Sequence, residues 1–299
     1  METVKLKPST RGYIWGGKRL FNYGKESNDE IIAETWELSY YPGGECFIDS
    51  GEYKGKMLKD VATNNDLGKN IKKHEFFPIL IKLIDANQDL SVQVHPSDKY
   101  ALEHEHSYGK TEMWYVVEAT EDAMLHIGFN KDVTKDEVEQ RIKDGTILEV
   151  MNHIKVKPGD CYFIPSGTLH AIGKGCLVIE IQENSDLTYR VYDYGRVGKD
   201  GKPRELHIEK ALKVTNYEKT EVYNIQGHFL ANNIYFRVRK EENIREIVAG
   251  LDSFVTFTVI EGSGTANNMP FSKGDTFFIP AGKRVSFSGT FKIIVTNIN

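Results

Sequence analysis

The stretch Gly159-Asp-Cys-Tyr-Phe-Ile-Pro165-Ser-Gly167-Thr-Leu-His170 decides the fold, because the chain carries the same phrase twice. Gly274-Asp-Thr-Phe-Phe-Ile-Pro280-Ala-Gly282-Lys-Arg-Val285 keeps the glycines, the proline and the apolar strand between them. At the last position, Val285 stands where the first copy has His170. The copies lie too far apart for a solenoid, whose repeats span about 20 to 50 residues. The pattern therefore predicts two related β domains, of which only the first keeps a potential metal ligand.

Composition narrows the class of protein. A chain of 299 residues with 40% hydrophobic and 27% charged residues is long enough and apolar enough for two globular domains. The net charge of −5 gives no general attraction to nucleic acid, although a local basic pocket can still bind a phosphate. The 3 cysteines form no CxxC motif, which favours a reducing compartment. Because no apolar run resembles a signal or a membrane span, we expect a cytoplasmic protein without a membrane partner.

Most of the chain alternates with a period of two, which indicates strands. The clearest strands are residues 90–95, 112–117, 177–182, 254–260 and 291–295. Helical spacing is rare, and it predicts helices in residues 56–71, 97–105, 134–152 and 206–214. We therefore expect a mainly β chain with a domain boundary near residue 215, so that residues 1–215 carry a few inserted helices and residues 216–299 form a smaller domain.

Polar residues two positions apart on the predicted strands share a face, opposite an apolar face. These polar sets are Ser91, Gln93 and His95; Lys110 and Glu112; and Glu180 and Gln182. If the polar faces meet, Gln93, His95, Glu112 and His170 offer two imidazole nitrogens and two oxygens to one divalent cation. Such a set suits zinc, and manganese, iron or nickel can also use it. A fifth position left for water or substrate would make the site catalytic.

Each candidate also has a structural interpretation. A single histidine at a strand end is often only hydrogen-bonded, and the spacing of Gly and Pro before His170 favours it as a ligand. Glutamine is an uncommon zinc ligand, and Glu112 could be a solvated charge at a strand edge. Lys82, inside an apolar run, lies either at an exposed edge or in a polar pocket, and we favour the pocket. His104-Glu105-His106 imitates a His-x-His metal motif, but its segment does not alternate, so we prefer His95.

Further phrases along the chain point to a family. In order, they are Trp15-Gly-Gly-Lys18, Ala33-Glu-Thr-Trp-Glu37, Phe77-Pro-Ile-Leu-Ile-Lys-Leu-Ile-Asp85, Leu90-Ser-Val-Gln-Val-His-Pro96, Gly109-Lys-Thr-Glu-Met-Trp-Tyr115, Pro165-Ser-Gly-Thr-Leu-His-Ala171 and Tyr189-Arg-Val-Tyr-Asp-Tyr-Gly-Arg196. Together they resemble type I mannose-6-phosphate isomerases in their short bacterial form, which are cupins. The resemblance implies two cupin-type (jelly-roll) barrels, a catalytic metal-binding one in residues 1–215 and a degenerate one in residues 216–299. The sequence departs from the family pattern at Thr111, at Lys174 and in the short segment of residues 107–109 that leads to Lys110.

The resemblance also implies a site. One zinc ion per chain would be held by Gln93, His95, Glu112 and His170. The pocket would be completed by Ser91, Lys110, Glu180, Asp186 and Arg190. Lysines matching Lys82 and Lys110 lie near the substrate in this family, and Arg190 is a proposed catalytic residue.

The implied reaction interconverts mannose 6-phosphate and fructose 6-phosphate through a cis-enediol, so the expected partner is a small hexose 6-phosphate. The metal would act as Lewis acid and template. A lysine beside a dication releases its proton more easily, which makes Lys110 a candidate acid or base, with Glu180 and Asp186 as carboxylate alternatives. Arg190 suits stabilisation of the enediolate or the phosphate.

Other functions compete with this one. An iron-dependent cupin oxygenase is disfavoured by Gln93 and by the lack of a third well-placed histidine. A non-catalytic sugar-binding cupin is disfavoured by Lys110, Glu180 and Arg190 occurring together. A metal-dependent cupin that acts on another sugar phosphate is the alternative within the same class, and the oligomeric state stays open.

Overall fold

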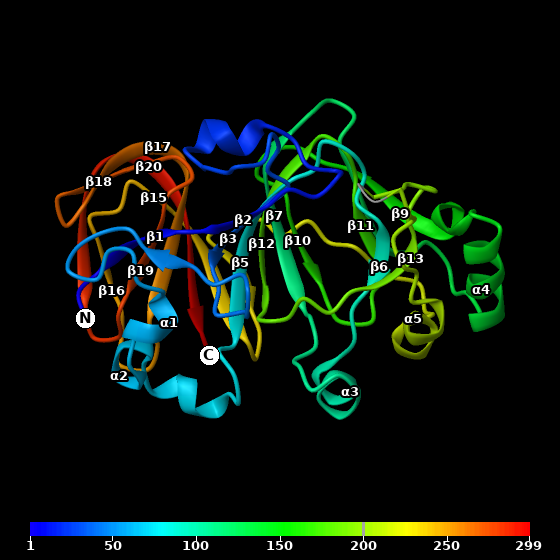
Figure 1. The fold of residues 1–299 in the computed structure, drawn as a ribbon, viewed down its shortest axis with the longest axis horizontal. Coiled ribbons are helices and arrows are strands. Elements are labelled where there is room, and N and C mark those ends of the chain that lie inside the picture. The colour runs from blue at the N-terminus through cyan, green and yellow to red at the C-terminus, as the bar shows by residue number, and fades with distance from the viewer. Residues whose placement is uncertain (199–200) are drawn as a thin grey trace. The chain divides into compact units, whose positions relative to one another are not determined.

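The computed structural model describes residues 1–198 and 201–299, which divide into two compact units. Unit 1 comprises Met1–Arg11, Lys18–Leu83 and Gln226–Asn299, and unit 2 comprises Gly12–Gly17 and Ile84–Ile225. Strands account for 39% of the chain and helices for 15%, so the prediction of a mainly β protein is confirmed (Figure 1). The domain boundary expected near residue 215 stays a prediction.

Unit 2 is built on two antiparallel sheets that fit a cupin-type jelly roll. One six-stranded sheet contributes three neighbouring strands to this unit, in the order β10 (Cys161–Ile164), β7 (Glu112–Ala119) and β12 (Cys176–Glu183). The other has the order β13 (Tyr189–Tyr192), β6 (Val92–Val94), β11 (His170–Ile172), β8 (Met124–Phe129) and β9 (Met151–Lys155). The strands predicted around residues 90–95, 112–117 and 177–182 are confirmed as β6, β7 and β12.

Helices cover the outer face of the five-stranded sheet (Figure 1). α4 (Lys135–Lys143) and α5 (Ile208–Val214) contribute Val138, Ile142 and Leu212 to an apolar core that also contains Val92 and Val94 of β6. Because side chains alternate along a strand, Gln93 between these valines points to the opposite face, toward the inside of the unit. Burial of the apolar stripe thus fixes which side chains line the interior.

The predicted helix over residues 134–152 is correct only in its first half. Thr134 begins α4, since its hydroxyl accepts a hydrogen bond from the Glu137 N–H at 3.1 Å. The helix ends at Lys143, and Gly145, two residues further on, has a φ of 70° that no continuing helix could adopt. A short 3-10 turn (Ile147–Val150) and strand β9 follow, so helical spacing past Gly145 was misleading.

The remaining helices are short. Residues 97–105 give α3 (Asp98–His104), and residues 206–214 give α5. Residues 56–71 break into α1 (Leu58–Val61), α2 (Asn64–Leu67) and a 3-10 turn (Lys69–Lys73), because a capping box at Thr63 starts a new helix. A further 3-10 turn spans Arg19–Tyr23. Every helix in the described part of the chain is too short or too polar to span a bilayer.

Unit 1 contains a nine-stranded sheet that joins both ends of the chain. Its strands are β1 (Val4–Lys7), β4 (Phe47–Ile48), β14 (Phe229–Asn232), β15 (Phe236–Glu242), β16 (Glu246–Val248), β17 (Val255–Ala266), β18 (Met269–Ser272), β19 (Thr276–Ile279) and β20 (Arg284–Ile298). β2 (Ser9–Arg11) pairs with β3 (Glu34–Leu38), and β5 (Ile79–Asp85) leaves unit 1 after Leu83. The strand predictions at residues 254–260 and 291–295 are confirmed within β17 and β20.

The two copies of the repeated phrase adopt matching backbones. Gly159 and Gly274 both have a φ of 94°, and Gly167 and Gly282 have φ angles of 85° and 78°. The apolar stretch between them forms β10 in unit 2 and β19 in unit 1. Val285 is fully buried in an apolar cluster of unit 1, so the second copy packs a hydrophobic side chain where the first presents His170. The predicted relation between the copies is thus visible in the backbone.

Candidate metal centre

Three strands and one strand end of unit 2 carry the predicted ligands. His170 begins β11 and is paired with Gln93 of β6, so the two side chains share the inner face of the five-stranded sheet. Arg190 of β13 is paired with Gln93 on its other side. Glu112 begins β7 on the second sheet, opposite Gln182 of β12. Alternation along each strand therefore directs these polar groups inward.

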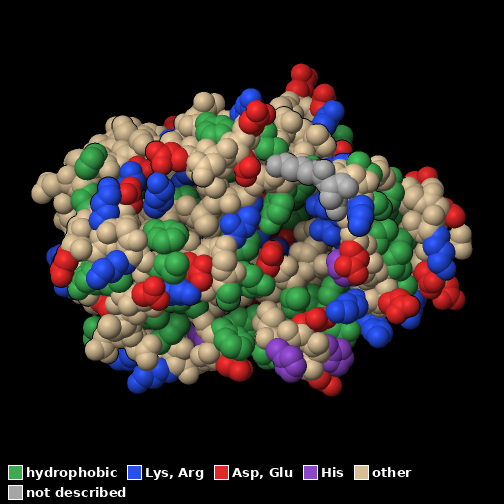
Figure 2. Space-filling view, in the orientation of Figure 1, with side chains coloured by type: hydrophobic (Ala, Val, Ile, Leu, Met, Phe, Trp, Pro, Cys, Tyr) green, Lys and Arg blue, Asp and Glu red, His purple; other side chains and the backbone are tan. Residues whose placement is uncertain are grey.

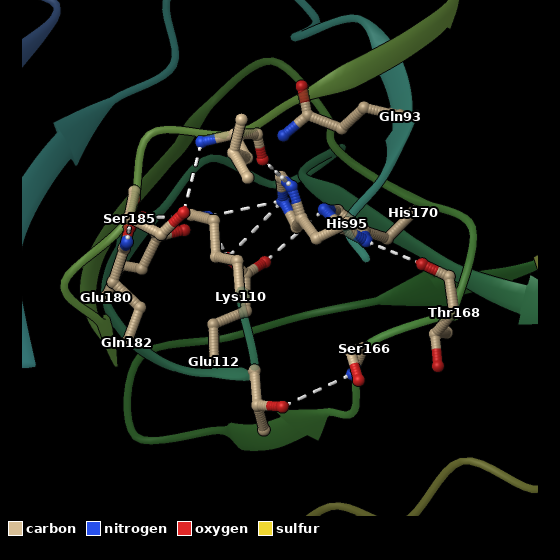
Figure 3. A network of polar contacts seen from close by, with 12 residues as sticks. Gln93, His95, Lys110, Glu112, Ser166, Thr168, His170, Glu180, Gln182 and Ser185 are labelled. Carbon is tan, nitrogen blue, oxygen red and sulfur yellow. Dashed lines mark hydrogen bonds and ion pairs between the residues drawn. The ribbon is translucent and has the colours of Figure 1, made fainter. Parts of the chain in front are cut away.

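His95, Glu112 and His170 form a buried cluster whose donor atoms all lie within 4.8 Å of one another. His170 Nε2 is 3.3 Å from Glu112 Oε1, and His95 Nε2 is 3.7 Å from Glu112 Oε2. None of the three side chains is more than 1% exposed. Figure 3 shows both imidazoles beside Glu112 and Lys110. Of the histidines weighed from the sequence, His95 belongs to this buried cluster, whereas His104 and His106 are exposed.

Backbone carbonyls set the orientation of both imidazoles. His95 Nδ1 lies 2.6 Å from the Leu187 carbonyl oxygen, and His170 Nδ1 lies 2.9 Å from the Thr168 carbonyl oxygen. Because a carbonyl only accepts, each Nδ1 carries the proton and each Nε2 presents a lone pair. Burial, together with the charge of Lys110, lowers the pKa of His170 to about 4, so this ring is neutral near pH 7.

This arrangement fits a divalent cation. The lone pair of His170 Nε2 faces the carboxylate oxygen Glu112 Oε1, and two acceptors in contact repel each other unless a positive charge lies between them. Within the described part of the chain, His170 Nε2 is buried without a hydrogen-bond donor. Two imidazoles and a carboxylate are the ligand types that zinc accepts in catalytic sites. The amide of Gln93 lies next to the imidazoles in Figure 3, and its Oε1 accepts a hydrogen bond from Ser91 Oγ at 3.2 Å.

Lys110 brings a positive charge to the same cluster. Its Nζ contacts Glu112 Oε2, lies 3.2 Å from His95 Nε2, and lies 3.5 Å from Glu180 Oε1. Lys110 and Glu180 are each 3% exposed. The other oxygen of Glu180 accepts a hydrogen bond from Trp114 Nε1 at 2.9 Å. The structure thus brings Lys110 and Glu180 to the predicted ligands.

Arg190 and Ser91 lie at the side of the cluster formed by β6 and β13. Arg190 Nε donates to Ser91 Oγ at 3.1 Å, and its Nη1 donates to the Glu205 carbonyl at 3.0 Å. Burial lowers the pKa of Arg190, and the nearby charge of Arg204 acts in the same direction. A guanidinium still keeps its proton at neutral pH. Arg190 therefore supplies a fixed cation beside Gln93.

Two predicted residues are placed differently from the rest. Asp186 is exposed, and its charge acts on Arg190 over a longer distance than a hydrogen bond. Lys82 belongs to unit 1, where it is 4% exposed, lies 3.5 Å from Glu34 Oε2, and sits over the Trp36 ring at 5.0 Å. Of its two predicted environments, the exposed strand edge is therefore wrong.

The alternative histidine motif lies on the surface. His104 and His106 are exposed at the end of α3, and Figure 2 shows histidine side chains on the surface near this helix. Sequence reasoning missed the Thr168 and Leu187 carbonyls, which carry no residue-type signal. It also missed Trp114, although alternation from Glu112 places Trp114 on the same inward face.

Comparisons with known proteins agree with this geometry. A family model described as phosphomannose isomerase type I, catalytic domain, matches residues 3–125. The mannose-6-phosphate isomerase ManA of Bacillus subtilis (strain 168) is 38% identical over 301 residues, which cover 94% of this chain and 94% of that protein. The crystal structure of a mannose 6-phosphate isomerase from Bacillus subtilis has a TM-score of 0.89 at 36% identity and covers 99% of both chains. A mannose 6-phosphate isomerase bound with zinc and yttrium shares the fold, with a TM-score of 0.77 at 18% identity over 100% of both chains.

Proposed function

Because the chain belongs to the type I phosphomannose isomerases, we propose that it interconverts mannose 6-phosphate and fructose 6-phosphate at one divalent metal ion per chain. The aldose–ketose isomerase class follows from family membership over nearly the whole chain. The observation that carries the proposal for the site is the buried cluster of His95, Glu112 and His170. The compartment that we propose is the cytoplasm, since the buried Cys46, Cys161 and Cys176 remain thiols.

The ion that we propose is zinc, held by His95, Glu112 and His170 with Gln93 as the fourth ligand. Two neutral imidazoles, a carboxylate and an amide oxygen match the preferences of zinc, and a relative with the same fold binds zinc. When bound, such an ion supplies Lewis acidity at the carbonyl and hydroxyl groups that exchange during the isomerisation.

Lys110 is the residue that we propose to move the proton between C2 and C1 of the opened sugar. Its Nζ is buried beside Glu112 and is held toward the interior by Glu180 at 3.5 Å. An amine held in this position can act as acid or base toward a substrate that lies beside it. Glu180 is the alternative base, and its hydrogen bond from Trp114 keeps the carboxylate fixed. Asp186, being exposed, is better suited to the mouth of the site.

Arg190 is proposed to stabilise negative charge on the substrate. Its hydrogen bonds to Ser91 and to the Glu205 carbonyl use Nε and Nη1, which leaves donors of the same guanidinium for an enediolate or a phosphate. Ser91 is 3% exposed and holds Arg190 beside Gln93. Lys82 stays a proposed substrate-binding residue on the strength of the family resemblance.

Elemental analysis of the purified protein, combined with a coupled assay on mannose 6-phosphate, tests the proposal. We expect one zinc per chain and formation of fructose 6-phosphate. Chelation should lower the rate by about 100-fold or more, because a Lewis acid contributes several kcal/mol to the barrier.

His170→Ala should lower the rate by a similar factor, and added zinc should restore the chelated parent but not this variant. An unchanged rate after both treatments would reject the proposal. Oxygen uptake, or faster turnover of another sugar phosphate, would favour one of the alternative cupin functions instead.

A further inference from the structure

The orientation of His95 depends on a loop that follows β12. The carbonyl that fixes its ring belongs to Leu187, at 2.6 Å from Nδ1. A shift of this carbonyl by a few tenths of an ångström would turn the ring and move Nε2 away from Glu112. The position of the loop therefore matters for the metal ligand.

One buried hydroxyl holds this loop in place. Ser185 is 0% exposed, and its Oγ donates to the Tyr108 carbonyl at 2.9 Å and accepts from the Leu187 N–H at 3.3 Å. Gln182 closes the loop from the other side, because its Nε2 donates to the carbonyls of Ser185 and Glu183 at 2.6 and 2.7 Å. Figure 3 shows Ser185 and Gln182 together at one edge of the network.

The same hydroxyl reaches the segment that leads to Lys110. Tyr108 precedes Lys110 by two residues, and the backbone of Lys110 is tied to Pro96, next to His95, by a hydrogen bond of 3.1 Å. The Ser185 hydroxyl thus links two backbone segments near the site. One is the loop whose Leu187 carbonyl orients His95, and the other is the segment from Tyr108 to Lys110.

We propose that Ser185 is a positioning residue that sets the affinity of the metal centre through the Leu187 carbonyl and His95. The proposal rests on the metal site proposed above. Outer groups that orient a ligating imidazole change metal affinity by about 10- to 100-fold when they are removed. If Ser185 only stabilised the loop, its loss would lower the stability of the protein and leave metal affinity unchanged.

The chain provides a matched control in Ser253 of unit 1. Its Oγ donates to the Phe254 carbonyl at 2.6 Å and accepts from the Ile298 N–H at 3.0 Å, and it is 7% exposed. Ser253→Ala therefore deletes the same pair of hydrogen bonds as Ser185→Ala, in a part of the chain that contributes no ligand to the cluster.

The experiment compares zinc affinity, measured by competition with a chromophoric chelator, in the parent, Ser185→Ala and Ser253→Ala. We expect Ser185→Ala to weaken zinc binding by about 10- to 100-fold and Ser253→Ala to change it by less than about 2-fold. Both variants should lower the melting temperature of the metal-free protein. The imidazole nitrogen chemical shifts of His95 should change only in Ser185→Ala, since they report the hydrogen bond of Nδ1 directly.

Equal zinc affinity in the parent and Ser185→Ala, or equal weakening in both variants, would overturn the proposal. If the parent itself takes up no zinc, the proposed metal site fails instead, so the two failures are distinct. Should Ser185→Ala not fold, Ser185→Cys keeps the shape of the side chain with a weaker donor. A folded Ser185→Cys with the affinity of the parent would equally overturn the proposal.

Discussion

At the scale of single residues, the metal centre depends on which side-chain groups are neutral and which are charged. His170 is neutral because it is buried, whereas Glu112 faces it with a carboxylate at 3.3 Å. Lys110 adds a cation to the same space. The site thus brings together acceptor atoms that repel one another unless a positive charge lies between them, and the ammonium group of Lys110 lies next to them.

Glu183, at the end of β12, makes stability depend on pH. Its carboxyl accepts a hydrogen bond from the Thr111 N–H at 2.6 Å. Burial, together with the nearby carboxyl of Asp98, raises the pKa of Glu183 to about 9. In the unfolded chain, a glutamate has a pKa of about 4.3. Between about pH 4.3 and 9, the folded protein therefore holds a proton that the unfolded chain has released, and stability falls as pH rises through this window.

Glu183→Gln should remove this dependence, because the amide stays neutral and can still accept from Thr111. We expect the free energy of unfolding of the variant to rise relative to the parent from about pH 5 to about pH 9, by at most about 1.4 kcal/mol per pH unit. Urea denaturation of both proteins across this range measures it. Exposed Glu52→Gln serves as control and should stay within about 0.5 kcal/mol of the parent. A difference that is flat with pH would contradict the expectation.

At the scale of elements, the turn between β10 and β11 connects the two sheets of unit 2 and also orients a candidate ligand. Gly167 has a φ of 85°, and the next residue supplies the carbonyl that orients His170. The corresponding turn of unit 1 contains Gly282 with a φ of 78°, and it leads to the buried Val285. The two turns have the same backbone, and only one of them serves a polar site.

Gly167→Ala and Gly282→Ala make this difference measurable. An added Cβ at Gly167 would lie 3.0 Å from the Val214 carbonyl, and one at Gly282 would lie 3.1 Å from Leu251 Cδ2. The positive φ costs each variant about 1–2 kcal/mol of stability. Only Gly167→Ala should also weaken zinc binding, because it displaces Thr168. Denaturation and chelator competition on both variants test this, and equal zinc affinity in the two would disprove the link between turn and ligand.

At the scale of the whole molecule, the candidate metal ligands and the longest pair of strands belong to different units of the chain. The clustered ligands all belong to unit 2, and the long ladder of β17 and β20 belongs to unit 1. A cation that joins residues from two sheets should stabilise the unit that contains them, since ligand binding adds to the stability of the native state.

Hydrogen exchange with and without chelator should show where that stabilisation acts. We expect removal of the metal to speed exchange of the amides in β6, β7 and β11 by about 10-fold or more, as local opening becomes less costly. Amides in β17 and β20 should exchange at nearly unchanged rates. The measurement is mass spectrometry of peptides from both regions, and uniform acceleration throughout the chain would contradict the expectation.

Much of this arrangement could be predicted from the sequence, because period-two alternation is a local property. It predicted β6, β7 and β12, and the inward face that carries Gln93 and Glu112. The repeated phrase also predicted the turn that leads to His170, and the same turn geometry occurs in the second copy. Long-range contacts were not predictable in this way. No local pattern reveals that the Leu187 carbonyl meets His95.

Unit 1 is assembled from segments that lie far apart in the sequence, and this affects the order in which the nascent chain folds. Its N-terminal strand β1 pairs with β19, so that Val4 lies opposite Phe278. During translation, Val4 is made long before Phe278, so this edge of β1 has no partner strand until β19 has been synthesised. Residues Ile84–Ile225 are translated during that wait. Unit 2 can therefore fold before β19 is made, while the unpaired edge of β1 needs protection from aggregation until then.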